Sequence, residues 1–370
     1  MIIDFSRNNR QRQQILIQCW TSPKIAVQAR VARAYYIRTA PVCSRSNLMK
    51  GIAAGGKMNW ASSLYAAIQG TAKKSLIKSR GISWEKAAVF EAVFFEVVNK
   101  CNSSCSFCNA SVQNDTRARK EMSFELYDNF IGQLVQMNFT GRVAFHVAND
   151  PLVFADLEHF VAHAKAKLPQ CWIQIMTNGI GLSPKRGEAL IESGMDELYI
   201  NFYRTSRQQK LYPNVVKFIA EVLERRFPNK KRGVYISNDG KSRLKFTLAP
   251  RLVKEVLWSR AGTSPNKRCD NTRARGFCLY PWTQLNISTN GMISKCCADI
   301  HFADPMGDLT ERTIADVWNG EPFTHVRKQL MSDDRSSLQG CSECDYFGIP
   351  TSAIANPFLK LIKYHMFAKY

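Results

Sequence analysis

The sequence predicts an α/β fold in which strands and helices alternate around a parallel sheet. Short runs rich in Val, Ile and Phe are typical of buried strands, and amphipathic segments that open with Ser or Pro are typical of helices. The two kinds alternate from residue 89 to residue 248. Such an order indicates repeated βα units joined by right-handed crossovers.

The predicted elements follow one another in a regular order. We expect strands over residues 89–98, 142–148, 172–177 and 198–203, and two later strands over 233–237 and 244–248. We expect helices over 123–137, 155–168, 184–193 and 214–226. Ser123 is placed to cap the first helix, whose apolar face carries Leu126, Phe130, Leu134 and Met137.

Side chains alternate between apolar and polar along the predicted strands. We expect the apolar set to face the helices: Val143, Phe145, Val147, Ile173, Ile175, Leu198, Ile200, Phe202, Leu244, Phe246 and Leu248. The other set carries His146, Gln174, Met176, Tyr199, Asn201, Tyr203, Lys245 and Thr247. A closed eight-stranded barrel fills its interior with branched apolar side chains, so this polar set predicts a more open barrel with a polar ligand inside. An ordinary sheet with one exposed face would show the same alternation.

Length and cysteine content limit the class of protein. A chain of 370 residues exceeds what one core usually organises, so we expect two domains and an appendage. Twelve cysteines without a signal-peptide pattern indicate a reducing compartment, and the cytoplasm is the expected location. The most apolar run, residues 87–98, holds two glutamates and is too short to cross a membrane, so no transmembrane helix is expected.

The formal net charge of +21 is concentrated at the N-terminus. Residues 1–84 hold fourteen Lys or Arg residues and one acid, Asp4. Such a segment would suit an acidic substrate, nucleic acid or anionic lipid, and it also has the composition of an organelle transit peptide. A solvated extension that is partly helical or disordered, with no partner, is an equally good interpretation.

Three thiols lie close together in one short loop, at Cys101, Cys105 and Cys108. Three residues separate the first pair and two separate the second, so one cuboidal iron–sulfur cluster could collect all three thiolates. A tetrahedral zinc site would need a fourth ligand, and the sequence that follows, as far as residue 116, has neither Cys nor His. Three unrelated loop thiols are the alternative interpretation.

A CxxxCxxC loop with Phe107 before its third cysteine, placed after the first strand of a βα series, resembles the radical S-adenosylmethionine (SAM) superfamily. The resemblance implies that the three cysteines hold a [4Fe–4S] cluster whose fourth iron binds SAM. It also places the backbone around Phe107 near the adenine and Asn201 near the ribose.

Two further segments take part in this resemblance. The family's GGEPLL segment, which handles the SAM amino group, corresponds to Ala148–Val153, and the TNG turn corresponds to residues 177–179. Asp150 replaces the usual Glu, while Ala148 and Asn149 replace both glycines. An acid is retained, so an ammonium group can still be bound, but the amide pattern and the reach must differ.

The C-terminal part, from Cys278 to Cys344, resembles the SPASM domain that carries auxiliary clusters in many radical SAM enzymes. Gly291 permits a hairpin that returns Cys296 towards Cys278, and Cys341 and Cys344 can reach one metal from a single loop. The resemblance implies that these four cysteines bind one auxiliary [4Fe–4S] cluster. No cysteine follows Cys344, as in the shortened variants called Twitch domains.

Several cysteines lie outside these two sets. Cys297 could exchange with its neighbour Cys296 as a ligand. We expect Cys269, Cys171, Cys19 and Cys43 to be small buried apolar residues, although Cys269 could also be a spare ligand or a hydrogen donor.

Together the motifs predict an organisation in four parts. The parts are a basic N-terminal extension over 1–87, a partial (β/α)6 radical SAM barrel over 88–265, a SPASM/Twitch-like auxiliary domain over 266–350 and a tail over 351–370.

The implied activity is that of a radical SAM oxidoreductase. An electron from a reduced flavodoxin or ferredoxin would cleave SAM to a 5′-deoxyadenosyl radical, which abstracts hydrogen from a substrate C–H bond. His146 and Tyr203 are candidate catalytic residues on the inward parity, and Lys245 could pair with a substrate acid.

The substrate class stays open at this stage. Peptide modification, as oxidation, crosslinking or epimerisation, is our first expectation, because the basic extension would suit an acidic leader peptide. Radical dehydrogenation or epimerisation of a sugar or aminocyclitol is the alternative. A non-catalytic protein that binds metal and nucleic acid is a second alternative, although the basic charge lies outside the cysteine segments and no nucleic-acid motif accompanies it.

Overall fold

The computed structural model describes residues 79, 81–84, 87–206, 208–254, 256, 259–267, 277–332 and 334–346. The tail over 351–370 and nearly all of the basic extension lie outside the described residues, as do Cys19, Cys43 and Cys269. The described residues belong to one compact unit, Ser75–Tyr370. None of the helices described in it is long and apolar enough to cross a membrane.

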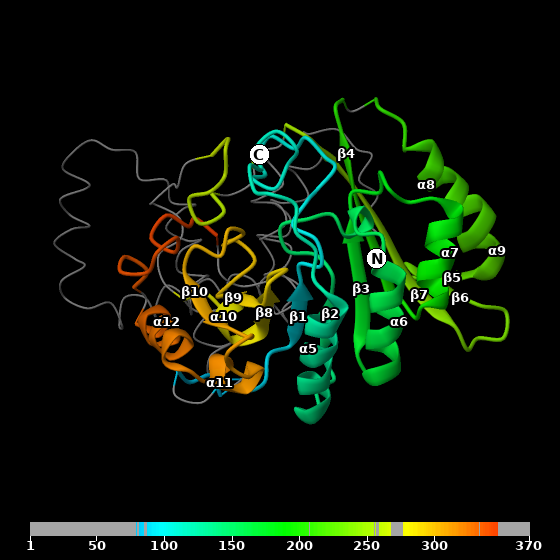
Figure 1. The fold of residues 1–370 in the computed structure, drawn as a ribbon. Coiled ribbons are helices and arrows are strands. Elements are labelled where there is room, and N and C mark those ends of the chain that lie inside the picture. The colour runs from blue at the N-terminus through cyan, green and yellow to red at the C-terminus, as the bar shows by residue number, and fades with distance from the viewer. Residues whose placement is uncertain are drawn as a thin grey trace, which may run out of the picture. The chain divides into compact units, whose positions relative to one another are not determined.

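The described strands form one sheet in the order β10-β9-β8-β1-β2-β3-β4-β7-β6-β5 (Figure 1). In chain order they are β1 (Ala92–Phe95), β2 (Arg142–Ala144), β3 (Trp172–Thr177), β4 (Glu197–Arg204), β5 (Asn229–Lys231), β6 (Val234–Ile236), β7 (Arg243–Leu252), β8 (Gln284–Ile287), β9 (Met292–Ser294) and β10 (Pro305–Asp308). The neighbours from β8 through β1, β2, β3 and β4 to β7 pair in parallel. Antiparallel strands complete both edges, so the predicted α/β class is confirmed.

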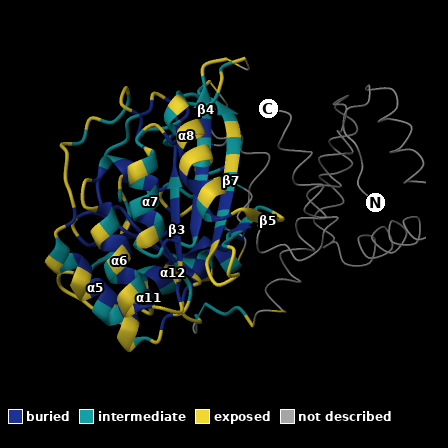
Figure 2. Cartoon of the chain, turned by 90° about the vertical axis from the view of Figure 1, so that its right-hand side faces the viewer, coloured by how far each residue is buried: buried dark blue, intermediate teal, exposed yellow. Residues whose placement is uncertain are grey.

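Helices cover the outer face of the parallel strands, and Figure 2 shows their exposed outer sides over buried β3. They are α5 (Phe124–Gln136), a 3-10 turn (Pro151–Val153), α6 (Leu157–Lys167), α7 (Pro184–Glu192), α8 (Pro213–Phe218), a π-helical turn (Ile219–Leu223) and α9 (Glu224–Arg226). Ser123 caps α5 as predicted, since its side chain accepts a hydrogen bond from the Leu126 amide. The buried face of α5 is centred on Tyr127 and Ile131, so Leu126 and Met137 lie at its margin.

The C-terminal part of the chain adds α10 (Tyr280–Thr283), α11 (Ile314–Trp318) and α12 (Glu321–Met331) beside β8, β9 and β10 (Figure 1). Strand β8 pairs with β1, so the sheet continues without a break from the N-terminal barrel strands into this part. Gly291 makes the predicted hairpin between β8 and β9, with a φ of +88° that favours glycine.

The predicted apolar parity is largely confirmed. Ile173, Ile175, Leu198 and Ile200, for example, are fully buried in the core that the helices cover. Val147 was assigned wrongly, because β2 ends at Ala144 and Val147 packs with Ala92, Phe94 and Ala144 on the other face. Leu248 is 37% exposed, whereas Leu244 and Phe246 earlier in β7 are buried, so the helix-covered core does not extend to this position.

Cross-strand register identifies the inner face of the sheet, which is opposite the helices. Partners in register share a face. One row on this face runs through Asn286, Phe94, Ala144, Gln174, Glu197 and Lys245. Strands of a parallel sheet all end at the same edge, so residues that follow β1, β2 and β3 meet there.

Candidate functional site

The cysteine loop, residues 100–108, follows the carboxyl end of β1. Cys105 is buried, and Cys101 and Cys108 are partly buried. Burial, reinforced by the nearby charges of Asp150, Cys108 and Cys105, raises the pKa of the Cys101 thiol to about 12. The three thiols are therefore near enough to repel one another as thiolates, and a bound metal centre would remove that repulsion.

Hydrogen-bond donors point at two of these sulfurs. The Asn178 side-chain amide donates to Cys101 Sγ at 3.7 Å, and the Ser103 hydroxyl lies 3.3 Å from Cys105 Sγ. Donors of this kind stabilise thiolates and tune the potential of an iron–sulfur cluster.

The thiols suit a cluster better than a single ion. Within the residues that the structure describes, no group of three or more His, Cys, Asp or Glu side chains is placed to hold one metal ion. Thiolates around one zinc ion lie within about 4 Å of each other, because each Zn–S bond is about 2.3 Å. A cuboidal cluster binds each thiolate through a different iron, so its ligands lie further apart.

The segment after β2 is bonded directly to the cysteine loop. The Asp150 amide donates to the Lys100 carbonyl at 3.0 Å. The Asp150 carboxylate accepts from the Leu152 amide at 3.0 Å and the Asn178 amide at 2.7 Å, and also from the Thr177 hydroxyl. Asp150 is therefore largely occupied in joining this segment to the turn after β3. Its role with the SAM ammonium group stays a prediction.

Both residues that replace the family's glycines have local roles. The Asn149 side chain accepts from the Val147 amide at 2.8 Å and donates to the Phe145 carbonyl at 3.1 Å, which closes the chain after β2. Ala148 is buried against Ala110 and Ile300. Where the family motif has two conformationally free glycines, this chain therefore has two residues whose side chains make local contacts.

The other residues predicted for SAM lie around the same edge. The ring of Phe107 is buried and lies 5.6 Å from the ring of Tyr203. Asn178 also donates to the Asn102 side chain at 2.7 Å, so the turn after β3 is hydrogen-bonded to both Cys101 and Asn102. Asn201 is half-buried on β4, between the buried residues Ile200 and Phe202. Their contacts with SAM stay predictions.

The C-terminal cysteines form a second group. Burial, followed by the charges of Cys297, Cys341, Cys278 and Cys344, raises the pKa of Cys296 well above its usual value. All four predicted auxiliary ligands therefore converge, and Cys297 lies beside them. A stacked pair of rings, Tyr280 and Tyr346 at 5.1 Å, adjoins these thiols, and the Tyr346 amide donates to Cys344 Sγ at 3.4 Å.

The candidate catalytic residues and Lys245 lie at different places on the sheet. Tyr203 lies near the cysteine loop. Burial raises its pKa, and the charges of Cys105 and Cys108 add to that rise. His146 is packed edge-on to Phe94 at 5.2 Å, and burial followed by the Arg142 charge lowers its pKa to about 4, so the imidazole is neutral. Lys245 is paired with Glu197 at 2.7 Å near the amino ends of β4 and β7, away from the cysteine loop.

Sequence reasoning missed several polar residues that the fold brings to this region. Arg260 precedes Ala261 and Gly262, and all three have positive φ values, of 49°, 56° and 80°. Burial raises the pKa of both Cys105 and Cys297, and the Arg260 charge opposes that rise at each, so this guanidinium lies within reach of both cysteine groups. Its buried Nε has no hydrogen-bond partner among the described residues. No periodicity or motif marks this loop, so the position of Arg260 beside the cysteine groups could not be predicted from the sequence.

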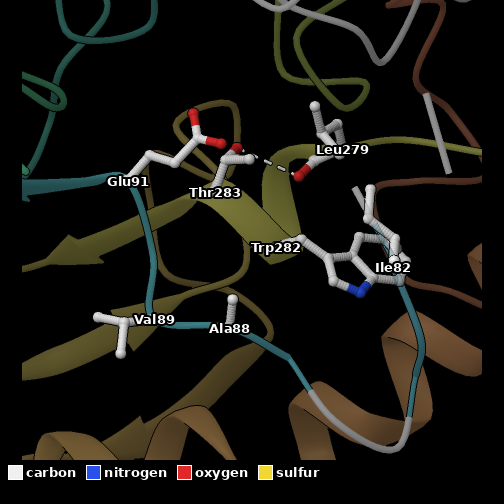
Figure 3. Close-up of a pocket in the computed structure, with 8 residues that line it drawn as sticks. Ile82, Ala88, Val89, Glu91, Leu279, Trp282 and Thr283 are labelled. Atoms are coloured by element: carbon white, nitrogen blue, oxygen red, sulfur yellow. Dashed lines mark hydrogen bonds between the residues drawn. The ribbon is translucent and has the colours of Figure 1, made fainter. Parts of the chain in front are cut away.

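A pocket of about 350 Å³ opens elsewhere, at the amino ends of β1 and β8 (Figure 3). Its lining is largely apolar, with Trp282, Leu279 and Ile82 to one side of Glu91 and Thr283. The cysteine loop follows the opposite, carboxyl end of β1, so this pocket is not the candidate site.

Comparison with known proteins agrees with this geometry. The radical SAM superfamily model matches residues 95–238, and the model of the SPASM iron–sulfur cluster-binding domain matches residues 278–345. A SAM-dependent 2-deoxy-scyllo-inosamine dehydrogenase from Niallia circulans is 25% identical over 263 residues, which are 71% of this chain and 96% of that protein.

Two solved structures share the fold. BtrN in complex with AdoMet and 2-DOIA superposes with a TM-score of 0.56 at 24% identity, covering 70% of this chain and 95% of that one. Selenomethionine BtrN in an open conformation superposes with a TM-score of 0.51 at 23% identity, covering 70% of this chain and 94% of that one.

The fold and the two cysteine groups define an iron–sulfur enzyme that uses SAM and [4Fe–4S] clusters. The chain contains a radical SAM domain followed by a C-terminal SPASM domain.

Proposed function

We propose that this enzyme oxidises a hydroxyl-bearing carbon of a small polar ring, of the aminocyclitol or sugar class, to a carbonyl. The similarity to a dehydrogenase of 2-deoxy-scyllo-inosamine over nearly that protein's full length supports this substrate class. It favours our alternative interpretation over peptide modification. The case for a peptide depended on the basic extension, most of which lies outside the described residues.

We propose Cys101, Cys105 and Cys108 as ligands of the SAM-binding cluster, and Cys278, Cys296, Cys341 and Cys344 as ligands of the auxiliary cluster. When bound, these groups supply the one-electron chemistry that removes a hydrogen atom from carbon and takes up a second electron. Loss of the hydroxyl proton completes a two-electron oxidation of the alcohol. The electron donor that we propose is a reduced flavodoxin or ferredoxin, and the location is the cytoplasm.

The observation that carries the substrate class is a set of buried polar groups without partners on the inner face. Asn286 is fully buried, and neither its amide nitrogen nor its oxygen has a hydrogen-bond partner within the described residues. His146 Nδ1 and Gln284 Oε1 are likewise unpaired there. Unpaired buried polar groups are costly, by about 1–3 kcal/mol each. Ring hydroxyl and amino groups would satisfy both donors and acceptors.

Charge also favours a small polar ring. His146 is neutral, so one ring nitrogen accepts and the other donates, as a hydroxyl group requires. Arg260 would place a cation beside the oxygen that loses its proton, because it lies within reach of both cysteine groups. The developing negative charge on that oxygen would then be stabilised.

Anaerobic assay of the full chain tests the proposal. Reconstituted protein with SAM, dithionite and 2-deoxy-scyllo-inosamine should release 5′-deoxyadenosine and an equal amount of the ketone formed from the alcohol. Cys105→Ala should release neither. Formation of 5′-deoxyadenosine without any oxidised ring, across a panel of aminocyclitols and sugars, would contradict the substrate class. Absence of 5′-deoxyadenosine from iron-loaded protein would contradict the enzyme assignment itself.

A further inference from the structure

One guanidinium joins the segments that surround both cysteine groups. Arg117 Nη2 donates to the carbonyl of Asn99 at 3.0 Å and to that of Ala148 at 3.2 Å, and Nη1 donates to the carbonyl of Ile300 at 3.4 Å. Asn99 leads into the cysteine loop, Ala148 leads into Asp150, and Ile300 lies in the loop that follows Cys296. Arg117 therefore links the SPASM part of the chain to the proposed SAM site.

Two buried acids hold this guanidinium in place. Asp115 accepts from Nε at 3.0 Å and from Nη2 at 3.1 Å, a bidentate pair. Glu96 accepts from Nη1 at 3.1 Å. Each acid has a side chain only 2% exposed. The planar fork of arginine matches this arrangement, and the ammonium of lysine would not.

The same three segments also pack together through apolar side chains. Ala110, Ala148 and Ile300 form a separate buried cluster, with Cys108 against its edge. Ala148 is 2% exposed and Ile300 is fully buried. A shift of the Ile300 loop would thus displace Ala148 both through its side chain and through the arginine bound to its carbonyl.

The displacement would reach the first cysteine group by a short route. Ala148 is two residues before Asp150, whose amide donates to the Lys100 carbonyl next to Cys101. Asn99, held by the same guanidinium, lies two residues before Cys101. Packed contacts of this kind carry coupling when they join two sites through a contiguous network.

We propose that Arg117 is a positioning residue that couples the auxiliary cluster site to the SAM site. Occupation of the auxiliary site fixes the Ile300 loop, and the hydrogen bonds of Arg117 then fix the backbone of Ala148 and Asn99. SAM then binds more tightly when the auxiliary cluster is present. The proposal rests on the proposed cluster ligands and is independent of the substrate class.

A double-mutant cycle on the full chain tests the coupling. SAM affinity is measured by anaerobic equilibrium dialysis for the iron-reconstituted wild type, Cys341→Ala, Arg117→Gln and the double variant. Cys341→Ala should weaken SAM binding about fivefold or more in the wild-type background. In the Arg117→Gln background the same change should alter the affinity by less than about twofold.

Two matched variants separate coupling from general damage. Arg117→Lys keeps the charge but loses the fork, so it should abolish the coupling while its circular dichroism matches that of the wild type; it carries the test if Arg117→Gln does not fold. Arg225→Gln removes an exposed ion pair with Glu188 and should retain the full coupling.

The EPR spectrum of dithionite-reduced protein is the second readout. Cys341→Ala should alter the SAM-induced change in the spectrum of the remaining cluster in the wild-type and Arg225→Gln backgrounds, and leave it unaltered in both Arg117 variants. An equal fold-loss of SAM affinity in all backgrounds would overturn the proposal. No assay in this series contains a ring substrate, so failure here would leave the dehydrogenase proposal standing.

Discussion

The hydroxyl of Thr177 lies 2.9 Å from each carboxylate oxygen of Asp150. Asp150 is 2% exposed and stands where the GGEPLL motif that this segment resembles has a longer glutamate. The shorter acid is thereby held against the turn after β3 by Thr177 and by the Asn178 amide. Because Asn178 also reaches Cys101, this contact connects the segment after β2 to the proposed cluster site.

Removal of that hydroxyl should loosen the SAM site. Thr177→Val keeps the β-branched shape but leaves the buried Asp150 carboxylate short of a donor, so the free energy of unfolding should fall by about 1–3 kcal/mol. SAM affinity should fall with it. Thr177→Ser keeps the hydroxyl and should bind SAM within about threefold of the wild type. Urea denaturation and anaerobic dialysis measure the two quantities, and equal behaviour of Val and Ser would contradict a role for the hydroxyl.

Local signals in the sequence predicted much of the barrel. Strand β3 begins and ends where alternation and the Asn178–Gly179 turn placed it, and Ser123 caps α5 as expected. These features depend on neighbours in sequence, which is why they could be predicted. Strand β7 runs on to Leu252 because β4 pairs with it along its length, and that pairing has no local signal.

Contacts between distant segments could not be predicted in this way. The pairing of β8 with β1 joins residues nearly two hundred positions apart, and it sets Asn286 beside Phe94 on the inner face. Arg117 and Arg260 belong to irregular loops, where neither period nor motif indicates a partner. Cys101, Cys105 and Cys108 were predicted as ligands from their spacing, since a cluster needs several thiolates at short intervals, and the four C-terminal cysteines from the resemblance to the SPASM domain. Their supporting polar contacts required the fold.

Iron content should distinguish the two adjacent cysteines. Burial, followed by the charges of Cys297 and of the other three predicted auxiliary ligands, raises the pKa of Cys296, so the Cys296 thiol lies close to those three cysteines. We expect about eight irons in the reconstituted wild type and in Cys297→Ala, and about four in Cys296→Ala. Iron and sulfide analysis measures this. The reverse pattern would make Cys297 the ligand, and four irons in the wild type would remove the auxiliary cluster.

Glu96 should make stability depend on pH. Burial raises the pKa of Glu96 to about 7, from a usual value of 4.5, even though Arg117 opposes the shift. The folded protein therefore favours the protonated acid, and this contribution is full below pH 4.5 and lost as pH rises through about 7. The stability of the wild type relative to Glu96→Gln should fall by up to about 3 kcal/mol between pH 4.5 and pH 8.

Chemical denaturation across that pH range measures the difference. Comparison with Glu96→Gln cancels the other titrating groups, because they are shared by both proteins. A difference that is constant with pH, or one that grows in favour of the wild type as pH rises, would contradict the raised pKa.

Asn286 separates a substrate role from a structural one. Its side chain is fully buried with both polar atoms unpaired among the described residues, so Asn286→Leu removes an unfavourable group and should leave the free energy of unfolding unchanged or higher. If the amide binds the ring substrate, the KM for that substrate should rise about tenfold, as expected for two lost hydrogen bonds. SAM affinity should stay the same. Steady-state assays with 2-deoxy-scyllo-inosamine, together with thermal denaturation, measure these effects, and a loss of stability with an unchanged KM would assign Asn286 to the fold.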